Sequence, residues 1–461
     1  MTNVIDSIVK NNLCVGCGIC LHACPDGILH IQTNGYGELV PFLAQECQKD
    51  CGACYKVCPF GDGNSNEDQI GQERFSSLSG IKHDPATGFY LSSFVGHVSS
   101  EQSRERSASG GLATWILKKL LLEGCIDAAI CVSPSPENES LYTYRVAKDV
   151  EDIESCSGSA YYPVQLSDVI SYITRTPGRY AITALPCFTK GLRLAQKRNN
   201  ILRERIVCIL GLTCGQMKNK QYTRYLAPLS GVQGELSSVH YRGKAADQPT
   251  TNYFFSCESE NGEKGTLYWD DGASKAWLSR WFTLNACNYC DDIYAECADA
   301  VVMDAWLPEY VSEWRGTNLL LVRDRMILEL VTDGVDNGEI IASSVPVSKI
   351  VQSQSGLIVF KRDDLRTRLW IAKRRGDIVP TKRVTAKRGL NGIVIMKARL
   401  LQDVQEKSKK LFNEGRDAVE VDIARFQRDM ERSQTQLRRL KALSDISTLP
   451  LAAIRRLRGG Y

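Results

Sequence analysis

Two runs of closely spaced cysteines near the start of the chain constrain its fold more than any other feature. Residues 14–25 read CVGCGICLHACP, and residues 47–59 read CQKDCGACYKVCP. In each run, three cysteines lie along a tight loop and the last cysteine precedes a proline. Three such thiolates can grip one 4Fe-4S cube while the fourth reaches a second cube, so the runs predict a pair of iron-sulfur clusters.

The exchange of the fourth cysteine between the runs predicts the two ligand sets. One set comprises Cys14, Cys17, Cys20 and Cys58, and the other comprises Cys24, Cys47, Cys51 and Cys54. The small residues Gly16, Gly18, Gly52 and Ala53 allow backbone amides to approach the cluster sulfides. Two all-cysteine zinc sites are the alternative. We therefore expect a ferredoxin-type module, which carries single electrons and needs a partner for chemistry on an organic substrate.

The remaining composition indicates a globular protein in a reducing compartment. The 461 residues are 43% hydrophobic and 24% charged, which suits two or three packed domains. No apolar run approaches the roughly 20 residues of a membrane helix, and the first residues lack the pattern of an export signal. We therefore expect a cytoplasmic protein, in which 18 cysteines and only 5 histidines point to metal or redox sites rather than to disulfides.

A polar stretch at residues 60–80 separates the cysteine runs from a longer mixed region. That region predicts an α/β (α+β) domain with a largely buried sheet, because short β-rich runs alternate with helical stretches. The predicted strands cover 128–133, 179–185, 205–212, 300–306 and 318–323, and the predicted helices cover 110–124 and 187–198. We expect a cluster domain at 1–75, the α/β domain at 90–345, a basic connecting segment at 346–394 and a helical extension at 395–445.

The C-terminal part is basic and helical. Residues 382–461 carry 19 Lys/Arg and 9 Asp/Glu, whereas the whole chain has a net charge of +4. An apolar stripe, interrupted at Ser433, runs through Val419, Ile423, Phe426, Met430, Leu437 and Leu440. The stripe predicts either a helical hairpin packed on its own domain or a coiled coil for oligomerisation or docking. Nucleic-acid binding is the weaker alternative and rests on charge alone.

Six stretches occur in an order typical of one redox family: 103–130, 156–170, 180–195, 208–215, 287–306 and 316–323. In this order they resemble the beta subunit family of coenzyme F(420) hydrogenase and dehydrogenase. The resemblance implies FAD beside a third 4Fe-4S cluster, held by Cys187, Cys214, Cys287 and Cys290. Cys187 and Cys214 each follow a β-rich run, as ligands at the ends of neighbouring strands would. Cys297 is the competing ligand.

The resemblance also indicates where FAD would bind. Ser107, Ser109, Gly110 and Gly111 precede an apolar helix, whose free amides could hold a phosphate, although ordinary helix capping gives the same pattern. Further candidates are Ser157, Ser159, Asp299, Asp304, Thr317 and Asn318. Ala160 stands where family members often have a basic residue, a departure that bears on the use of the deazaflavin. No GxGxxG motif joins a strand to a helix, so no Rossmann NAD(P)H site is predicted.

These observations predict an iron-sulfur flavoprotein oxidoreductase. Electrons would pass between a small organic substrate at FAD and an external ferredoxin-type carrier or partner subunit. The substrate is either the reduced deazaflavin coenzyme or an unsaturated or hydroxylated metabolite, including one of surface polysaccharide metabolism. No catalytic acid or base is singled out, and Tyr161, Tyr162 or an aspartate could supply protons. A noncatalytic electron-transfer or assembly subunit is the alternative.

Overall fold

The computed structural model describes residues 3–47, 51–135, 140–414 and 422–448. The first residues form a small cysteine-rich module with short elements. A helical turn at Ile5–Val9 is followed by α1 (Ile19–Ala23), the antiparallel hairpin β1 (Leu29–Thr33) and β2 (Leu39–Leu43), and α2 (Ala53–Lys56). The turn glycines Gly18 and Gly52 precede α1 and α2 with positive φ angles of 75° and 58°. In this way they bend the cysteine loops tightly, as the spacing of the runs requires.

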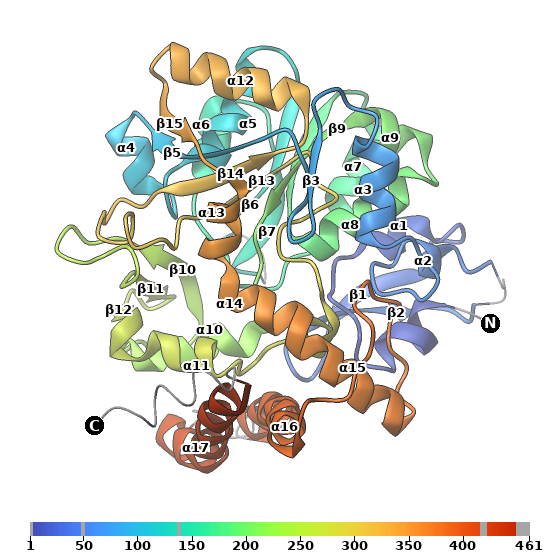
Figure 1. Ribbon diagram of the computed structural model, residues 1–461, viewed down its shortest axis with the longest axis vertical. Helices are drawn as coiled ribbons and strands as arrows, with labels where there is room; N and C mark the ends of the chain where they lie inside the picture. The colour runs from blue at the N-terminus through green and yellow to red at the C-terminus, as the bar shows by residue number, and fades with distance from the viewer. Residues whose placement is uncertain (1–2, 48–50, 136–139, 415–421, 449–461) are drawn as a thin grey trace.

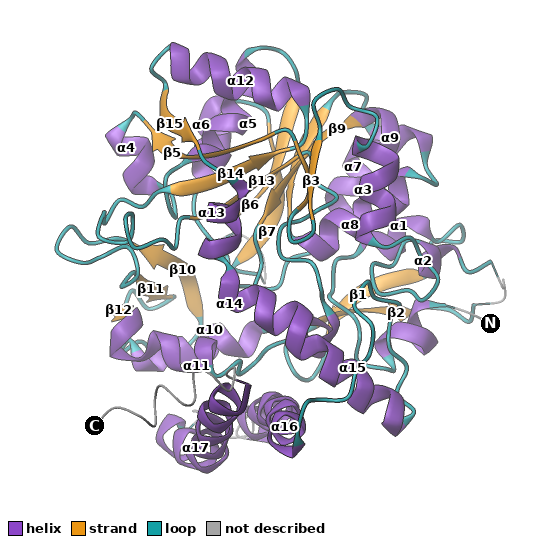
Figure 2. Cartoon of the chain, viewed as in Figure 1, coloured by secondary structure: helices purple, strands orange, loops and turns teal. Residues whose placement is uncertain are grey.

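An eight-stranded mixed sheet forms the centre of the larger body (Figure 2). Its order is β15 (Ile340–Ser344), β5 (Ser92–Val98), β14 (Asn318–Val322), β13 (Ala300–Asp304), β9 (Ile206–Leu212), β8 (Tyr180–Ala184), β6 (Ala128–Pro134) and β7 (Tyr142–Ala147). β13, β9, β8 and β6 are parallel, and the outer pairs are antiparallel. All five predicted strands are confirmed, because continuous apolar runs belong to a sheet that is buried on both faces.

Helices cover both faces of this sheet. One face packs on α5 (Leu112–Leu122), α6 (Val150–Ser155) and α12 (Arg325–Asp336), and the other packs on α7 (Ser167–Arg175), α8 (Pro186–Gln196) and α9 (Asn200–Arg205). The predicted helices at 110–124 and 187–198 correspond to α5 and α8. The fold of this body is therefore α/β, as predicted.

The remaining elements lie around the body. They are α3 (Glu67–Phe75), the hairpin β3 (Lys82–Asp84) and β4 (Gly88–Tyr90), α4 (Glu101–Arg106), α10 (Lys220–Leu229), the antiparallel sheet β10 (Leu236–Gly243), β11 (Phe254–Ser259) and β12 (Lys264–Tyr268), a helical turn at Trp269–Ala273, α11 (Ser274–Leu278) and a turn at Asn285–Tyr289. The sequence did not predict the β10–β12 sheet, whose strands are more exposed than those of the central sheet.

The C-terminal part wraps along one side of the molecule and ends in a helical hairpin (Figure 1). It contains α13 (Val347–Ser353), α14 (Ser355–Ile358), a turn at Val359–Asp363, α15 (Asp364–Arg375), α16 (Gly392–Glu414) and α17 (Ile423–Thr448). Phe426 and Met430 are buried against the body, so the described part of the apolar stripe packs within its own chain. Val419 lies outside the described residues. The hairpin interpretation is therefore the one that fits, and the stripe leaves no coiled-coil face at these positions.

The cysteine-rich module packs directly on the larger body. Leu166 N–H donates a hydrogen bond to the carbonyl of Cys17 at 2.9 Å. A Cβ at Gly191 in α8 would lie 2.7 Å from Ile19 Cδ1, and a Cβ at Gly18 would lie 2.6 Å from Gln165 Oε1. Glycine at both positions therefore allows the first cysteine run to approach α8 closely. In the described part of the chain, no helix has the length and apolar character needed to cross a lipid bilayer.

Candidate functional site

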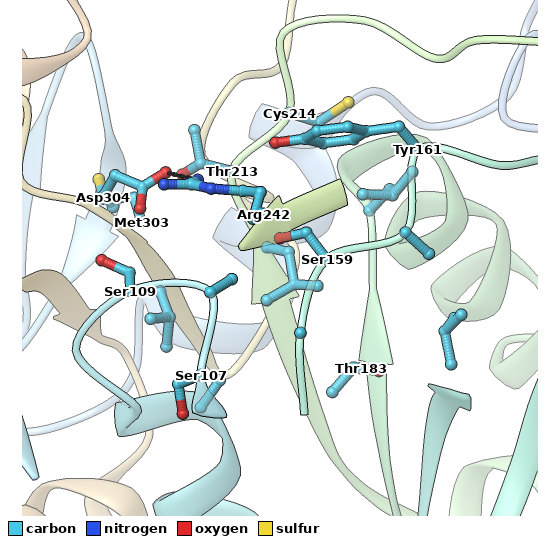
Figure 3. A pocket seen from close by; sticks show the side chains of 18 of the residues that line it. Ser107, Ser109, Ser159, Tyr161, Thr183, Thr213, Cys214, Arg242, Met303 and Asp304 are labelled. Carbon is cyan, nitrogen blue, oxygen red and sulfur yellow. Dashed lines mark hydrogen bonds and ion pairs between the residues drawn. The ribbon is translucent and has the colours of Figure 1, made fainter. Parts of the chain in front are cut away.

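A cavity of about 700 Å³ opens at the carboxyl ends of the parallel strands. Its walls include the ends of β6, β8, β9 and β13, together with the loop before α5 and the β10–β12 sheet. Figure 3 shows that it extends from Ser107 and Ser109 at one end to Tyr161 and Cys214 at the other. Ligands of α/β proteins bind at this edge of the sheet, where the strand ends leave a crevice.

The loop before α5 forms the small-residue end of the cavity. Gly111 caps the helix with φ 85°, and the N–H of Leu112 donates to Asn318 Oδ1 at 3.1 Å. Ser109 Oγ donates to the carbonyl of Thr317, and Lys244 Nζ donates to the carbonyl of Ser109 at 2.9 Å. Ala113 and Thr114 also line the cavity, and their amides belong to the first helical turn, which has no intrahelical acceptor for them. A fixed helix N-terminus therefore faces the cavity and suits an anionic group.

Two buried polar groups in the wall have no partner among the described residues. They are Thr213 Oγ1 and Arg242 Nε. Arg242 otherwise forms an ion pair with Asp304 at 2.7 Å and lies over the Tyr253 ring, 4.5 Å from its centroid. An unpaired buried donor costs about 1–3 kcal/mol, so this wall fits a polar ligand better than an empty apolar pocket.

Aromatic side chains form the other end of the cavity. Tyr161 lies 4.5 Å from Trp277 between ring centroids, and Tyr253 lies 4.9 Å from Trp269. Burial raises the pKa of Tyr161, although the nearby Arg242 charge lowers it. Flat rings that line the same cavity as Cys214 suit a planar conjugated ligand.

Most of the predicted cofactor residues are brought together in this cavity. Seven line it: Ser107, Ser109, Gly111, Ser157, Ser159, Asp304 and Asn318. Gly110 and Thr317 lie directly behind the wall, where Gly110 packs against Asn318 and the carbonyl of Thr317 accepts from Ser109.

Asp299 lies elsewhere, and its expected place at the cofactor is wrong for this structure. Its carboxylate is 1% exposed and accepts from Arg74, from Arg193 at 2.8 Å and from the Ile209 N–H at 2.7 Å. Burial raises the pKa of Asp299, but the charges of Arg193 and Arg74 lower it more, so that it lies below its usual value. These partners saturate the carboxylate, so its role is to hold α3 and α8 to the sheet.

Cys187, Cys214, Cys287 and Cys290 come together behind the aromatic end, although the chain separates them by up to about a hundred residues. Burial raises the pKa of Cys187 well above its usual value, and the charges of the other three thiols raise it further. The N–H of Met217 donates to Cys287 Sγ at 3.3 Å, as amides do around cluster ligands. Cys214 also lines the cavity, so the group borders the ligand space directly.

Buried cations surround this cysteine group. Lys361 Nζ lies 3.3 Å from Cys290 Sγ, and Arg280 is 8% exposed. No ion pair joins these two cations to a carboxylate among the described residues. Burial lowers the pKa of Arg280 to about 10, and the thiolate charges of Cys287, Cys214 and Cys290 oppose that shift. Buried positive charge needs a negative partner, so the surroundings fit an anionic cluster held by four thiolates.

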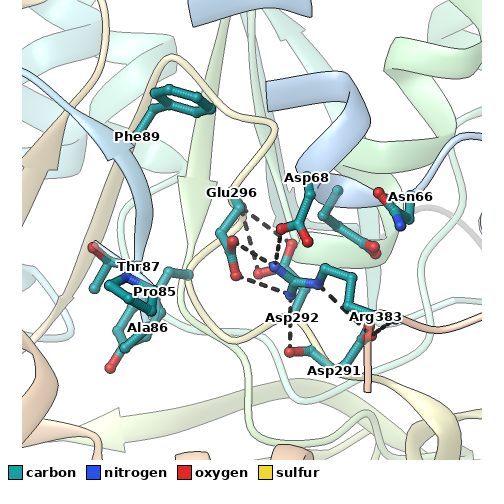
Figure 4. Close-up of polar contacts among 12 residues, drawn as sticks. Asn66, Asp68, Pro85, Ala86, Thr87, Phe89, Asp291, Asp292, Glu296 and Arg383 are labelled. Atoms are coloured by element: carbon teal, nitrogen blue, oxygen red, sulfur yellow. Dashed lines mark hydrogen bonds and ion pairs between the residues drawn. The ribbon is translucent and has the colours of Figure 1, made fainter. Parts of the chain in front are cut away.

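Cys297 lies apart from the four cysteines, and the nearby acids face away from the cavity. Cys297 is fully buried with Ile70 and Leu194. Asp291 and Glu296 bind Arg383 of the C-terminal segment, as Figure 4 shows. Cys297 thus packs in a small apolar cluster, and Asp291 and Glu296 hold the C-terminal segment to this loop.

The N-terminal cysteines lie within electrostatic reach of one another. Burial raises the pKa of Cys20 well above its usual value, and the charges of Cys17, Cys14, Cys58 and Cys54 contribute. Cys54 is affected in the same way by Cys24 and Cys51. Cys47 is half-buried and Cys51 is exposed, so the second group lies at the surface. The Cys17 charge also acts on Cys187, which places the first group next to the cavity-side group.

Two models of one protein family match this sequence. Residues 93–171 match the N-terminal part, and residues 178–347 the C-terminal part, of the coenzyme F(420) hydrogenase/dehydrogenase beta subunit. Together the two matches cover more than half of the chain. The chain belongs to this family. Residues 13–61 match the 4Fe-4S dicluster domain, so this family member carries an N-terminal ferredoxin-type module.

Similar proteins occur in Methanocaldococcus jannaschii and Methanosarcina barkeri. A coenzyme F(420)-dependent sulfite reductase of Methanocaldococcus jannaschii is 27% identical over 194 residues, which are 42% of this chain and 26% of that protein. An uncharacterized protein of the same organism is 24% identical over 240 residues, 46% of this chain and 62% of its own length. The chain thus spans about a quarter and about three fifths of these curated relatives. A chain of the F(420)-reducing [NiFe] hydrogenase complex of Methanosarcina barkeri aligns with a TM-score of 0.48 at 16% identity, covering 63% of this chain and 96% of that chain.

The sequence did not reveal several residues of the site. Arg242, Thr213, Lys218, Lys361 and Arg280 carry no local motif, and their position depends on long-range packing. The aromatic content of residues 253–277 was the one available signal, because Tyr253, Trp269 and Trp277 are dense in a segment that otherwise reads as polar loop.

Proposed function

We propose that this protein is an iron-sulfur flavoprotein oxidoreductase that moves electrons between an organic substrate and an external one-electron carrier. FAD would occupy the cavity, Cys187, Cys214, Cys287 and Cys290 would hold a third 4Fe-4S cluster, and the N-terminal sets would hold the other two. FAD supplies the exchange between electron pairs and single electrons, and the clusters carry single electrons.

The observation that carries this proposal is the double position of Cys214. It lines the cavity and also belongs to the four-cysteine group. Cys187 of that group lies within electrostatic reach of Cys17, and the second N-terminal group reaches the surface at Cys51. The chain therefore arranges its ligand space and three thiolate groups in a continuous series from the cavity to the exterior.

The residues of the cavity have separate roles in this proposal. The helix N-terminus behind Ser107 and Ser109 would bind phosphate groups through its amides. Arg242 and Thr213 would donate to polar atoms of the ligand, and Tyr161 and Trp277 would pack against its rings. Tyr161 and Asp304 are the candidates for proton transfer in the cavity wall, since both line it.

The substrate belongs to one of two classes: the reduced deazaflavin coenzyme, or an unsaturated or hydroxylated metabolite such as one of surface polysaccharide metabolism. Ala160 lines the cavity without a charge, and the basic side chains Arg242 and Lys218 line the same cavity. Anaerobic incubation with the reduced deazaflavin distinguishes the classes, because turnover restores the absorption of its oxidised form. An unchanged spectrum assigns the protein to the second class.

Iron and flavin analysis tests the proposal. Anaerobically purified protein should contain about twelve irons and one FAD per chain, from three four-iron cubes. Cys287→Ala should lower the iron content to about eight while the N-terminal clusters keep their spectra. Cys297→Ala is the matched control, because Cys297 is a buried cysteine of the same loop outside the group, and it should keep twelve irons. Eight irons and no flavin in the unaltered protein would refute the proposal and support a noncatalytic electron-transfer subunit.

A further inference from the structure

The segment beyond the family match contributes a buried cation to the four-cysteine group. Lys361 lies in the turn Val359–Asp363, after the end of the match at residue 347. Its Nζ is 3.3 Å from Cys290 Sγ and 2.7 Å from the Asp292 carbonyl, and the residue is 1% exposed. The lysine therefore points at the sulfur, held there by a backbone acceptor and shielded from water.

The same segment also positions a second cation. Arg280 has a left-handed φ of 57° and stacks on the ring of Phe360, with its guanidinium carbon 3.9 Å from the ring centroid. Its Nε and Nη2 are buried and have no hydrogen-bond partner among the described residues. Burial lowers the pKa of Arg280, whereas the charges of Cys287, Cys214 and Cys290 favour its protonated form. Those same three thiols favour the protonated form of Lys361.

The N-terminal groups have a different electrostatic environment. Among the described residues, the charge of Lys190 acts to lower the pKa of Cys58. Glu38 adds negative charge next to Cys14. The cavity-side group thus has Lys361 in direct contact with one of its sulfurs, with Arg280 nearby.

We propose that Lys361, together with Arg280, raises the reduction potential of the cavity-side cluster. One-electron reduction adds a negative charge to a thiolate-bound cluster, and a buried positive charge a few ångström away stabilises the reduced state more than the oxidised one. Lys361 is thus a positioning residue that acts through Cys290. The inference rests on the proposed function, since it requires a cluster at these four cysteines.

Redox titration of the full chain tests this role. The clusters would be reduced stepwise by dithionite with mediators and followed by electron paramagnetic resonance. Lys361→Met should lower the equilibrium constant for reduction of the cavity-side cluster about tenfold to a hundredfold. At 59 mV per tenfold, its reduction potential should become about 60–120 mV more negative. Lys361→Gln keeps a hydrogen-bond donor without the charge and should show most of the same shift. The N-terminal potentials should not move.

Lys349→Met is the control, since Lys349 lies on the adjacent helix in an exposed pair with Glu309 at 2.6 Å. It should leave all three potentials unchanged. Unshifted potentials in both Lys361 variants with twelve irons present would overturn the inference. So would the loss of four irons in both variants, which would make Lys361 an assembly residue instead. Unaltered protein with eight irons would show that the proposed function has failed, independently of Lys361.

Discussion

Arg383→Met should destabilise the protein by about 3 kcal/mol. The Arg383 guanidinium makes two contacts with Glu296, at 2.6 and 3.0 Å, and lies 3.7 Å from Asp291, and both carboxylates are at most 4% exposed (Figure 4). Removing one partner of a buried ion pair costs about 3–5 kcal/mol. The lower value applies because Glu296 keeps Arg362 at 2.7 Å and Asp291 keeps Lys382 at 3.4 Å.

Thermal unfolding under anaerobic conditions measures this effect. A loss of about 3 kcal/mol lowers the midpoint by about 6–12 °C for a unit of 150–250 residues. Burial raises the pKa of Asp291, but the charges of Lys382 and Arg383 lower it more, so that it lies below its usual value. The stability from that pair is therefore present above about pH 4 and is lost as the pH falls further. The variant should lose less stability than the unaltered protein over that acid range.

The exposed pair of Lys349 and Glu309 again supplies the control. Lys349→Met should change the free energy of unfolding by less than about 1 kcal/mol. If Arg383→Met and Lys349→Met had equal midpoints, the acidic loop would not depend on the C-terminal segment, and the electrostatic reasoning would be refuted.

Two further predictions concern the cavity wall and the C-terminal hairpin. Burial and the charges of Arg242 and Arg104 lower the pKa of Lys244 to about 7. The folded state therefore binds fewer protons than the unfolded state between about pH 7 and 10, and stability should rise with pH across that window. Lys244→Met should flatten this rise in thermal midpoints, and an unchanged slope would contradict the assignment. Phe426→Ala removes a 4% exposed ring stacked on Phe282 and should cost about 3–5 kcal/mol. Sedimentation should show the same oligomeric state as before, whereas dissociation would restore the coiled-coil interpretation.

The parts of the fold that sequence could predict are those with a strong local signal. The strands ending before Cys187 and Cys214 are continuous apolar runs, and burial on both sides of the sheet is what produces such runs. The spacing of the N-terminal cysteines likewise reflects a short loop around a cluster. Both signals lie within about twelve residues of chain, where backbone geometry alone relates pattern to structure.

The remaining features depend on contacts between distant segments. Asp291 and Glu296 were not singled out from the sequence, because their partner Arg383 lies about ninety residues later in a segment that reads as a basic linker. Asp299 was misplaced for the same reason, since Arg74 and Arg193 reach it from separate helices. A charged residue carries no local record of its partner, so sequence patterns alone cannot assign buried ion pairs.

The order of synthesis gives the packing of Lys361 and Arg383 a further consequence. All four cavity-side cysteines precede residue 291, while the lysine and arginine that close their surroundings leave the ribosome about seventy to ninety residues later. During translation, the thiols are thus complete before their cover exists. The positive charge of Lys361 therefore joins these thiols only after the part of the chain that carries them has been made.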